Sequence, residues 1–116
     1  MKYALLIYDN PAERPADEVA AERLNAQYAA LTQTIIDAGE MVGGERLARA
    51  DVATSVRIRA GQVSVTDGPF AETKEHLGGF YLIDVPDLDR ALAVAAEIPA
   101  AKTGVIEIRP VVPYSG

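Results

Sequence analysis

The sequence predicts an α+β domain of the ferredoxin-like, split β-α-β type, with an extra hairpin inserted before the third core strand. Three observations lead to this prediction. The apolar segments follow the order strand, helix, hairpin region, strand, helix, strand. In two of these segments the apolar residues recur at helical spacing, whereas the other segments are short and rich in β-forming residues. At 116 residues, the chain is expected to form one domain over 1–116.

The first two elements are a strand and a long helix. Residues 3–8 are apolar in both alternating sets, as in a central strand covered on two sides. Pro15, followed by Asp17 and Glu18, predicts the start of a helix over about 16–38. Gly39 is the expected stop. The predicted buried stripe consists of Leu24, Tyr28, Leu31 and Ile35.

The middle of the chain is rich in short β segments. Residues 41–47 fit either a strand or an extended segment. Residues 54–59 and 62–66 are separated by Ala60-Gly61, which is typical of a β-hairpin. A further strand is expected over 80–85.

A short helix and a closing strand complete the predicted fold. Asp87 is expected to cap the helix, and Pro99 to end it. The closing strand is expected over 105–111. The predicted buried stripe of the helix is Leu88, Ala91, Leu92, Ala95 and Ile98.

Right-handed crossovers would place both helices on one face of the sheet. The other face would then be uncovered. Whichever alternating set of 3–8 faces outward, it remains largely apolar. Because a bare apolar sheet is rare on a monomer, we expect a homodimer that stacks or interlocks two sheets.

Composition excludes several classes of function. The net charge is −6 and no Lys/Arg cluster is visible along the sequence, so nucleic acid is not an expected partner. No cysteine is present, which excludes disulfides and thiolate sites. The apolar run near the N-terminus is too short for a signal peptide or a membrane span, so we expect a cytoplasmic protein without membrane association.

No metal or cofactor is expected either. His76 is the single histidine and has no histidine partner for a metal. Gly39, Gly43 and Gly44 lack the spacing of a phosphate-binding loop.

The segment 65–85, VTDGPFAETKEHLGGFYLIDV, carries unusual backbone chemistry. Asp67-Gly68 is typical of a turn, and Phe70 is expected to anchor the turn in the core. Gly78-Gly79 fits a bulge or tight strand start, and alternatively lets a ligand approach the backbone.

This segment resembles the signature of the YCII-related family, in particular its DGPF-domain branch. The resemblance includes MKYALLIY at the start, AGEMVGGERL, and DLDRALAVAAEIPAAKTGVIEIRPV at the end. It implies a ferredoxin-type fold that dimerises into an α+β barrel, and a role linked in some relatives to sigma factors. Some relatives carry a His–Asp pair, but the first helix here has no histidine, so that pair does not carry over.

The candidate site residues each have a plainer alternative. Asp67 is either a general base or a turn cap. Asp84 and Arg109 form either the polar floor of a cleft or a structural ion pair. Lys74 either binds an anion or pairs with Glu75 in solvent. Tyr81 is either a ligand contact or a core aromatic. The expected ligand-binding set is Tyr81, Lys74, Gly78 and Gly79, beside a possible catalytic set of Asp67, Asp84 and Arg109.

Two hypotheses on function follow. The first is a small-molecule binder or enzyme with a cleft between the open sheet face and the DGPF loop. The second is a non-catalytic accessory or interaction module, connected with sigma-factor regulation as the resemblance implies. A cavity of a few hundred Å³ near Asp67, Tyr81, Asp84 and Arg109, together with a shifted carboxylate pKa, would favour the first. A filled barrel in which Asp67 bonds only to its own turn would favour the second.

Overall fold

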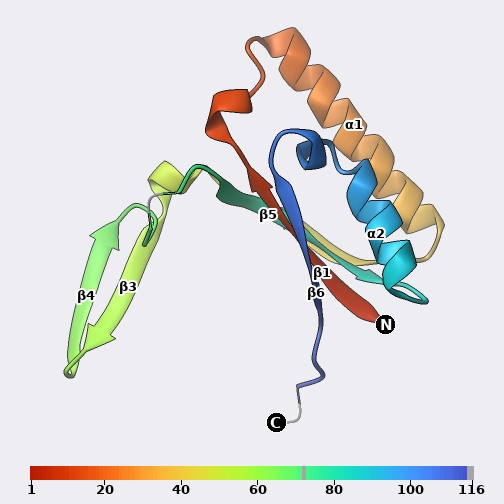
Figure 1. Ribbon diagram of the computed structural model, residues 1–116. Coiled ribbons are helices and arrows are strands. Elements are labelled where there is room, and N and C mark those ends of the chain that lie inside the picture. The colour runs from red at the N-terminus through yellow and green to blue at the C-terminus, as the bar shows by residue number, and fades with distance from the viewer. Residues whose placement is uncertain (72, 115–116) are drawn as a thin grey trace.

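The computed structural model describes residues 1–71 and 73–114. Its core is a four-stranded sheet in which every neighbouring pair is antiparallel, in the order β2-β5-β1-β6. The strands are β1 (Lys2–Asp9), β2 (Met41–Arg46), β5 (His76–Asp84) and β6 (Val105–Pro110). Both helices, α1 (Glu18–Asp37) and α2 (Leu88–Glu97), cover the same face of the sheet (Figure 1). The predicted mixed α+β class is confirmed, and the arrangement is consistent with a ferredoxin-like fold.

Side-chain caps fix the starts of both helices. The carboxylate of Asp17 accepts a hydrogen bond from the Ala20 amide at 2.8 Å, which begins α1. Asp87 accepts one from the Arg90 amide at 3.0 Å, as predicted for α2. Gly39 ends α1 in the left-handed region, with φ of +71°. Short 3₁₀ turns also lie at Pro11–Glu13, Ala50–Val52 and Pro99–Lys102.

The core lies between the helices and one face of the sheet. Its largest fully buried side chains are Leu5, Ile35, Ile83, Val94 and Ile98. The prediction was wrong for Leu88 and Leu92 of α2, which are about half exposed. At 100° per residue, Leu92 lies about a quarter turn away from Ala91, and Val94 takes its expected place in the buried stripe.

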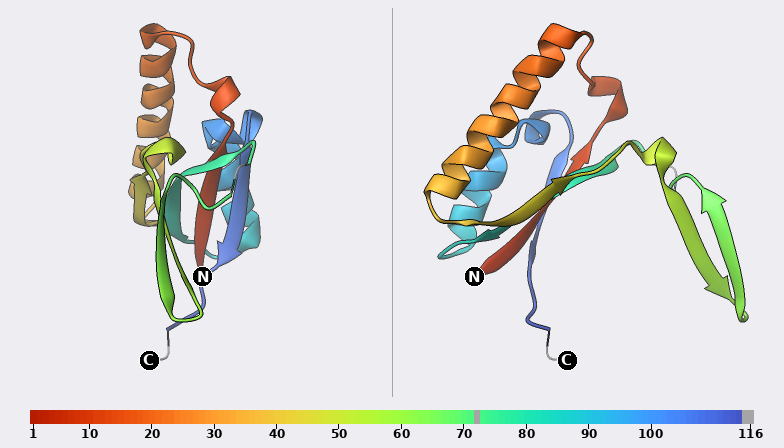
Figure 2. Two further views of the ribbon diagram at one scale, coloured as in Figure 1. Left: turned by 90° about the vertical axis from the view of Figure 1, so that its left-hand side faces the viewer. Right: turned by 180° about the vertical axis from the view of Figure 1, so that it is seen from behind.

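The inserted hairpin forms a separate two-stranded arm. It consists of β3 (Thr54–Arg59) and β4 (Gln62–Asp67), and Ala60 and Gly61 both adopt positive φ at its tip. The predicted hairpin is confirmed. The arm stands away from the sheet, on the side opposite the helices (Figures 1 and 2).

The base of the arm is closed by hydrogen bonds. The Gly68 amide donates to the Ala53 carbonyl at 2.7 Å, and Ser55 Oγ donates to the Gly68 carbonyl at 2.8 Å. Phe70, expected in the core, is 78% exposed, so that prediction was wrong. It follows Gly68 at the base of the arm, outside the layer between helices and sheet, where no core is within reach.

Strand alternation divides β1 between two environments. Tyr3, Leu5 and Ile7 are buried beneath the helices, whereas Leu6 and Tyr8 face the uncovered side and are half-buried. A β-bulge interrupts the pairing with β5, because Ile7 lies opposite Gly79 but Tyr8 lies opposite Leu77. Gly78 is the additional residue, which agrees with the bulge alternative for Gly78-Gly79.

Candidate functional site

An open cavity of about 940 Å³ lies between the N-terminal half of α1 and one end of the sheet. The C-terminal half of α1 packs on the core through Leu31 and Ile35. The earlier members of the same stripe, Leu24 and Tyr28, are only half-buried and line the cavity instead. The predicted stripe is therefore continuous along the helix, but its C-terminal half contacts the core and its N-terminal half lines the cavity.

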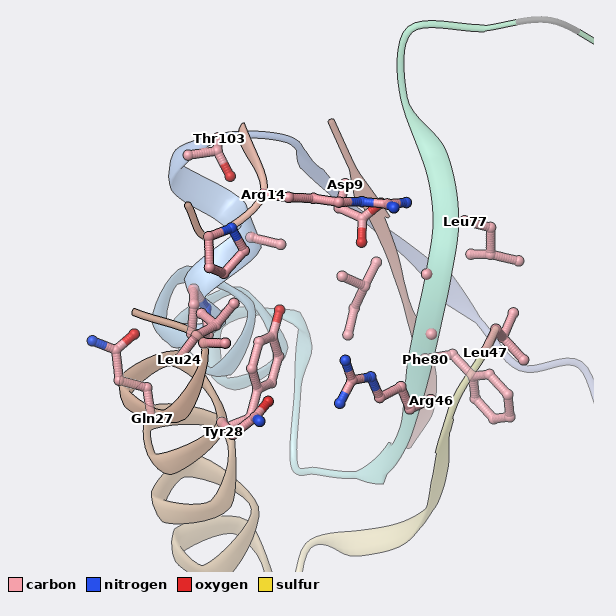
Figure 3. A pocket seen from close by; sticks show the side chains of 18 of the residues that line it. Asp9, Arg14, Leu24, Gln27, Tyr28, Arg46, Leu47, Leu77, Phe80 and Thr103 are labelled. Atoms are coloured by element: carbon pink, nitrogen blue, oxygen red, sulfur yellow. The ribbon is translucent and has the colours of Figure 1, made fainter. Parts of the chain in front are cut away.

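Polar side chains enter this cavity from both sides. Tyr28 of α1 and Arg46 of β2 point into the same space from opposite walls, and Asp9 and Arg14 lie beside its mouth (Figure 3). Arg46 faces the cavity because it pairs with Gly79, which in turn lies opposite the helix-facing Ile7. The arrangement combines two guanidinium groups, a phenol and a carboxylate.

Gly78 makes room for the Asp9 carboxylate. A Cβ atom on Gly78 would lie 2.6 Å from Asp9 Oδ2, closer than any van der Waals contact allows. His76 lies opposite Asp9 in the β1–β5 register and also lines the cavity. The bulge region thus brings a carboxylate and the single histidine to the same wall.

The cavity wall is rich in positive charge although the protein is acidic. Among the described residues, five of the chain's eleven lysines and arginines line it, but only three of its seventeen acids do. The basic residues are Arg14, Arg23, Arg46, Arg49 and Lys102, and the acidic ones are Asp9, Glu13 and Glu45. The sequence shows no Lys/Arg cluster because these five are spread over residues 14–102, and only Arg46 and Arg49 are near each other in sequence.

The phenol of Tyr28 stays protonated well above neutral pH. Burial raises the pKa of Tyr28 above its ordinary value of 10.0, and the nearby Tyr81 and the charge of Asp9 raise it further. The Ala100 backbone, second only to burial in its effect, and Arg46, whose effect is the smallest, act in the opposite direction. Tyr28 is therefore a hydrogen-bond donor rather than an anion.

Three of the residues expected to bind ligand lie at this cavity. Tyr81, Gly78 and Gly79 all line it. Tyr81 is 7% exposed, and its hydroxyl lies 2.8 Å from Thr32 Oγ1 on α1. Tyr81 is therefore part of the core, and it also lines the cavity.

Asp84 and Arg109 lie elsewhere and do not pair with each other. Asp84 contacts the N-terminal ammonium of Met1 at 3.0 Å and is 53% exposed. Arg109 Nε lies 3.2 Å from Glu107 Oε1 within β6. The cleft floor expected from Asp84 and Arg109 is not formed, because Asp84 pairs with the Met1 ammonium and Arg109 pairs with Glu107.

Asp67 and Lys74 are also separate from the cavity. Asp67 is exposed at the end of β4, opposite Thr54. Lys74 lines a shallow depression of about 430 Å³ on the uncovered side of the sheet, together with Tyr8 and Glu107. The seven predicted residues therefore do not converge on one site.

The polar residues of the cavity were missed from the sequence. Tyr28 was assigned to a core stripe, although a tyrosine within an apolar helix face already indicated a polar neighbour. Asp9, Arg14 and Arg46 carried no local signal, because each lies in a different segment.

Neither a metal cluster nor a membrane-spanning helix is found within the described ranges. No group of three or more histidine, cysteine, aspartate or glutamate residues there could hold a metal ion. None of the described helices is long and apolar enough to cross a bilayer.

Comparisons with known proteins give the family. The YCII-related domain matches residues 1–115. A protein of Rhizobium meliloti (strain 1021), described only as uncharacterized, is 39% identical over 117 aligned positions, covering 98% of this chain and 94% of the relative. Since the match extends over nearly the entire length of both proteins, the chain belongs to the YCII-related family.

Proposed function

We propose that this protein binds a small organic anion in the cavity between α1 and the sheet. The observation that carries the proposal is the concentration of five basic side chains around one cavity in a protein of net charge −6. Its volume of about 940 Å³ lies at the upper end of the range typical of small-molecule sites.

The residues suggest how such an anion would be held. Arg46 and Arg14 would donate paired hydrogen bonds to a carboxylate or phosphate group. Tyr28 would donate a third from the opposite wall, since its phenol is protonated. Leu24, Ile7 and Met41 would contact an apolar body. Asp9 is the group placed to accept a proton from the ligand if the protein also catalyses a reaction.

A ligand screen tests the proposal directly. Thermal unfolding would be measured with a panel of small carboxylates and phosphate esters, followed by calorimetric titration of each compound that raises Tm. The Arg46→Gln variant should weaken the tightest binder about 10- to 100-fold, because a charge-assisted pair of hydrogen bonds is lost. Changes in the ligand after incubation would reveal turnover.

Arg57→Gln is the matched control. Arg57 is an exposed arginine on the arm and does not line the cavity, so the same loss of charge should leave affinity unchanged. The proposal would be wrong if no anion raised Tm, or if both variants weakened binding equally.

The accessory-module hypothesis remains the alternative. The two criteria for the small-molecule hypothesis are not met as stated. Of the four residues named for the cleft, only Tyr81 lines the cavity, and the carboxylate whose pKa is lowered, Glu40, pairs with Arg90 outside the cavity. The DGPF-domain branch is proposed from Asp67-Gly68-Pro69-Phe70 and the LGGFYLI strand. The link to sigma factors and the cytoplasmic location likewise remain predictions.

We also propose that the protein acts as a homodimer. The helices cover one sheet face, and the other presents Leu6, Tyr8, Phe80 and Leu82 only partly buried. A second copy would remove these side chains from water.

A further inference from the structure

The β3–β4 arm has one apolar face and one polar face. Val56 lies opposite Val65, and Ile58 lies opposite Val63, so these four β-branched side chains share one side of the hairpin. All four are between 61% and 66% exposed. The other side carries Ser55, Arg57, Arg59, Gln62, Ser64 and Thr66.

Nothing else in the described chain covers this apolar face. The arm forms a sheet of its own and is joined to the domain through hydrogen bonds at its base, around Ala53 and Gly68. A two-stranded hairpin by itself is at best marginally stable in water. Four exposed Val and Ile side chains on such a hairpin indicate a surface that is covered when the protein functions.

The uncovered sheet face offers the complementary surface. Its apolar residues are Ala4, Leu6, Tyr8, Phe80 and Leu82, all only partly buried. The arm stands on this same side of the sheet, but it extends away from the sheet of its own chain (Figures 1 and 2). The arm and the open sheet face therefore lie beside one space on this side of the molecule, and they belong to separate sheets.

We propose that a second copy of this chain fills that space, with the arm of each copy lying by its apolar face on the open sheet face of the other. The inference rests on the homodimer proposed above and specifies how it is held together. A two-fold axis would let both arms make the same contact, as isologous dimers require.

The absence of acids from residues 54–66 of the arm is compatible with a second copy as the occupant. Residues 54–66 include Arg57 and Arg59 but no acid, whereas the sheet carries Glu45 and Glu107 on the strands that border the open face. Glu107 Oε1 is buried without a hydrogen bond in the described chain, despite its proximity to Arg109. Arg57 and Arg59 lie on the polar side of the arm and point away from the sheet that the arm would cover, but residues 54–66 place no acid beside Glu45 and Glu107 where two acidic chains meet.

The surface area that a stable dimer must bury requires the arm as well as the sheet face. Four strands about 4.8 Å apart and about 20 Å long present a face of about 400 Å², so two such faces reach only the size of a crystal contact. The arm adds about 200 Å² per copy. With both arms, the interface reaches the lower limit of stable complexes, about 1,200 Å² in total.

Excision of the arm tests the inference. Because the Gly68 amide already donates to the Ala53 carbonyl at 2.7 Å, residues 54–67 can be replaced by a two-glycine link without stretching the chain. Sedimentation velocity should show a dimer for the full chain and a monomer for the excised protein at the same micromolar concentration. Far-UV circular dichroism should show that the helices remain.

Two double substitutions to aspartate, both on β4, distinguish the roles of the two faces of the arm. Val63→Asp with Val65→Asp should raise the dimer Kd at least about 100-fold. Ser64→Asp with Thr66→Asp adds the same charge to the opposite face of β4 and should have a much smaller effect.

The outcomes distinguish this inference from the dimer itself. A monomeric full chain would overturn both. A full-chain dimer that persists after excision, or that responds equally to both charge pairs, would overturn the role of the arm and leave the sheet-face dimer in place.

Discussion

Arg90 on α2 donates three hydrogen bonds to the carboxylate of Glu40, the residue that precedes β2. Arg90 Nε lies 3.1 Å from Oε1 and 3.0 Å from Oε2, and Nη2 lies 2.7 Å from Oε1. The Glu40 side chain is only 12% exposed. This bidentate pair joins the second helix to the edge of the sheet across fifty residues of sequence.

The Glu40–Arg90 pair predicts a pH-dependent stability. Hydrogen bonding by Arg90 lowers the pKa of Glu40 below its ordinary value of 4.5. Since the folded pKa is depressed, the stabilisation is complete above pH 4.5 and is lost as pH falls through the folded value. Urea unfolding should therefore show Glu40→Gln less stable than wild type at pH 7, with the difference closing at low pH. The control is Glu22→Gln at an exposed position of α1, which should change stability at pH 7 by less than about 0.5 kcal/mol.

Adjacent isoleucines in α1 should respond very differently to truncation. Ile35 is 1% exposed within the core, and Ile36 is 49% exposed. Ile35→Ala should lower the free energy of unfolding by about 2–5 kcal/mol through lost burial and a residual cavity. Ile36→Ala should change it by less than about 1 kcal/mol. Equal losses measured by chemical denaturation would contradict the packing of α1.

Gly104 lies where β6 begins against the backbone of β1. A Cβ there would collide with the Tyr8 carbonyl oxygen and approach Asp9 Cα to 3.1 Å. Because backbone atoms cannot move aside easily, Gly104→Ala should destabilise the protein by about 2 kcal/mol or more. Gly43→Ala is the control, since its Cβ would meet nothing within 4 Å. Thermal unfolding of the two variants compares them directly.

Gly78→Ala should disturb the cavity rather than the fold. The atom it would approach, Asp9 Oδ2, ends a side chain that can rotate away. We expect a stability loss below about 1 kcal/mol. A crystal structure should show the Asp9 carboxylate displaced from the strand, and an unchanged carboxylate position would show that Gly78 is not required there.

Tyr28 provides a spectroscopic test of the cavity's electrostatics. Subtracting the ultraviolet titration of Tyr28→Phe from that of wild type isolates one phenol, which should ionise above the ordinary pKa of 10.0 because it is partly buried. Removing the charge of Asp9 with Asp9→Asn should lower this pKa, and Arg46→Gln should raise it. Shifts of the opposite sign would mean that the two charges are placed wrongly around Tyr28.

Local chemistry explains what could be predicted from the sequence. The Asp87 cap, the Gly39 stop and the Ala60-Gly61 turn each depend on a few neighbouring residues, and all three are confirmed. Phe70 was misplaced because a large aromatic after a turn is often an anchor, but here the turn lies at the base of an arm remote from the core.

The site was harder to predict because it is assembled from distant segments. Arg14, Arg46 and Lys102 belong to different segments of the chain, and only the packing of α1 over the sheet brings them around one cavity. For Asp84, the sequence indicated a need for a partner but not which residue would supply it. Its position in a strand indicated a partner, but sequence alone did not indicate that the partner would be the amino group of Met1.

The β-bulge has a consequence for which side chains enter the cavity. Strand residues alternate between faces, so an additional residue in a regular ladder would reverse the orientation of everything before it, whereas a bulge accommodates that residue outside the pairing. With Gly78 present, His76 shares the side of Asp9, and Leu77 shares the side of Tyr8. If Gly78 instead paired with Tyr8 in a regular ladder, Leu77 would lie opposite the Asp9 carboxylate and the imidazole of His76 would turn outward.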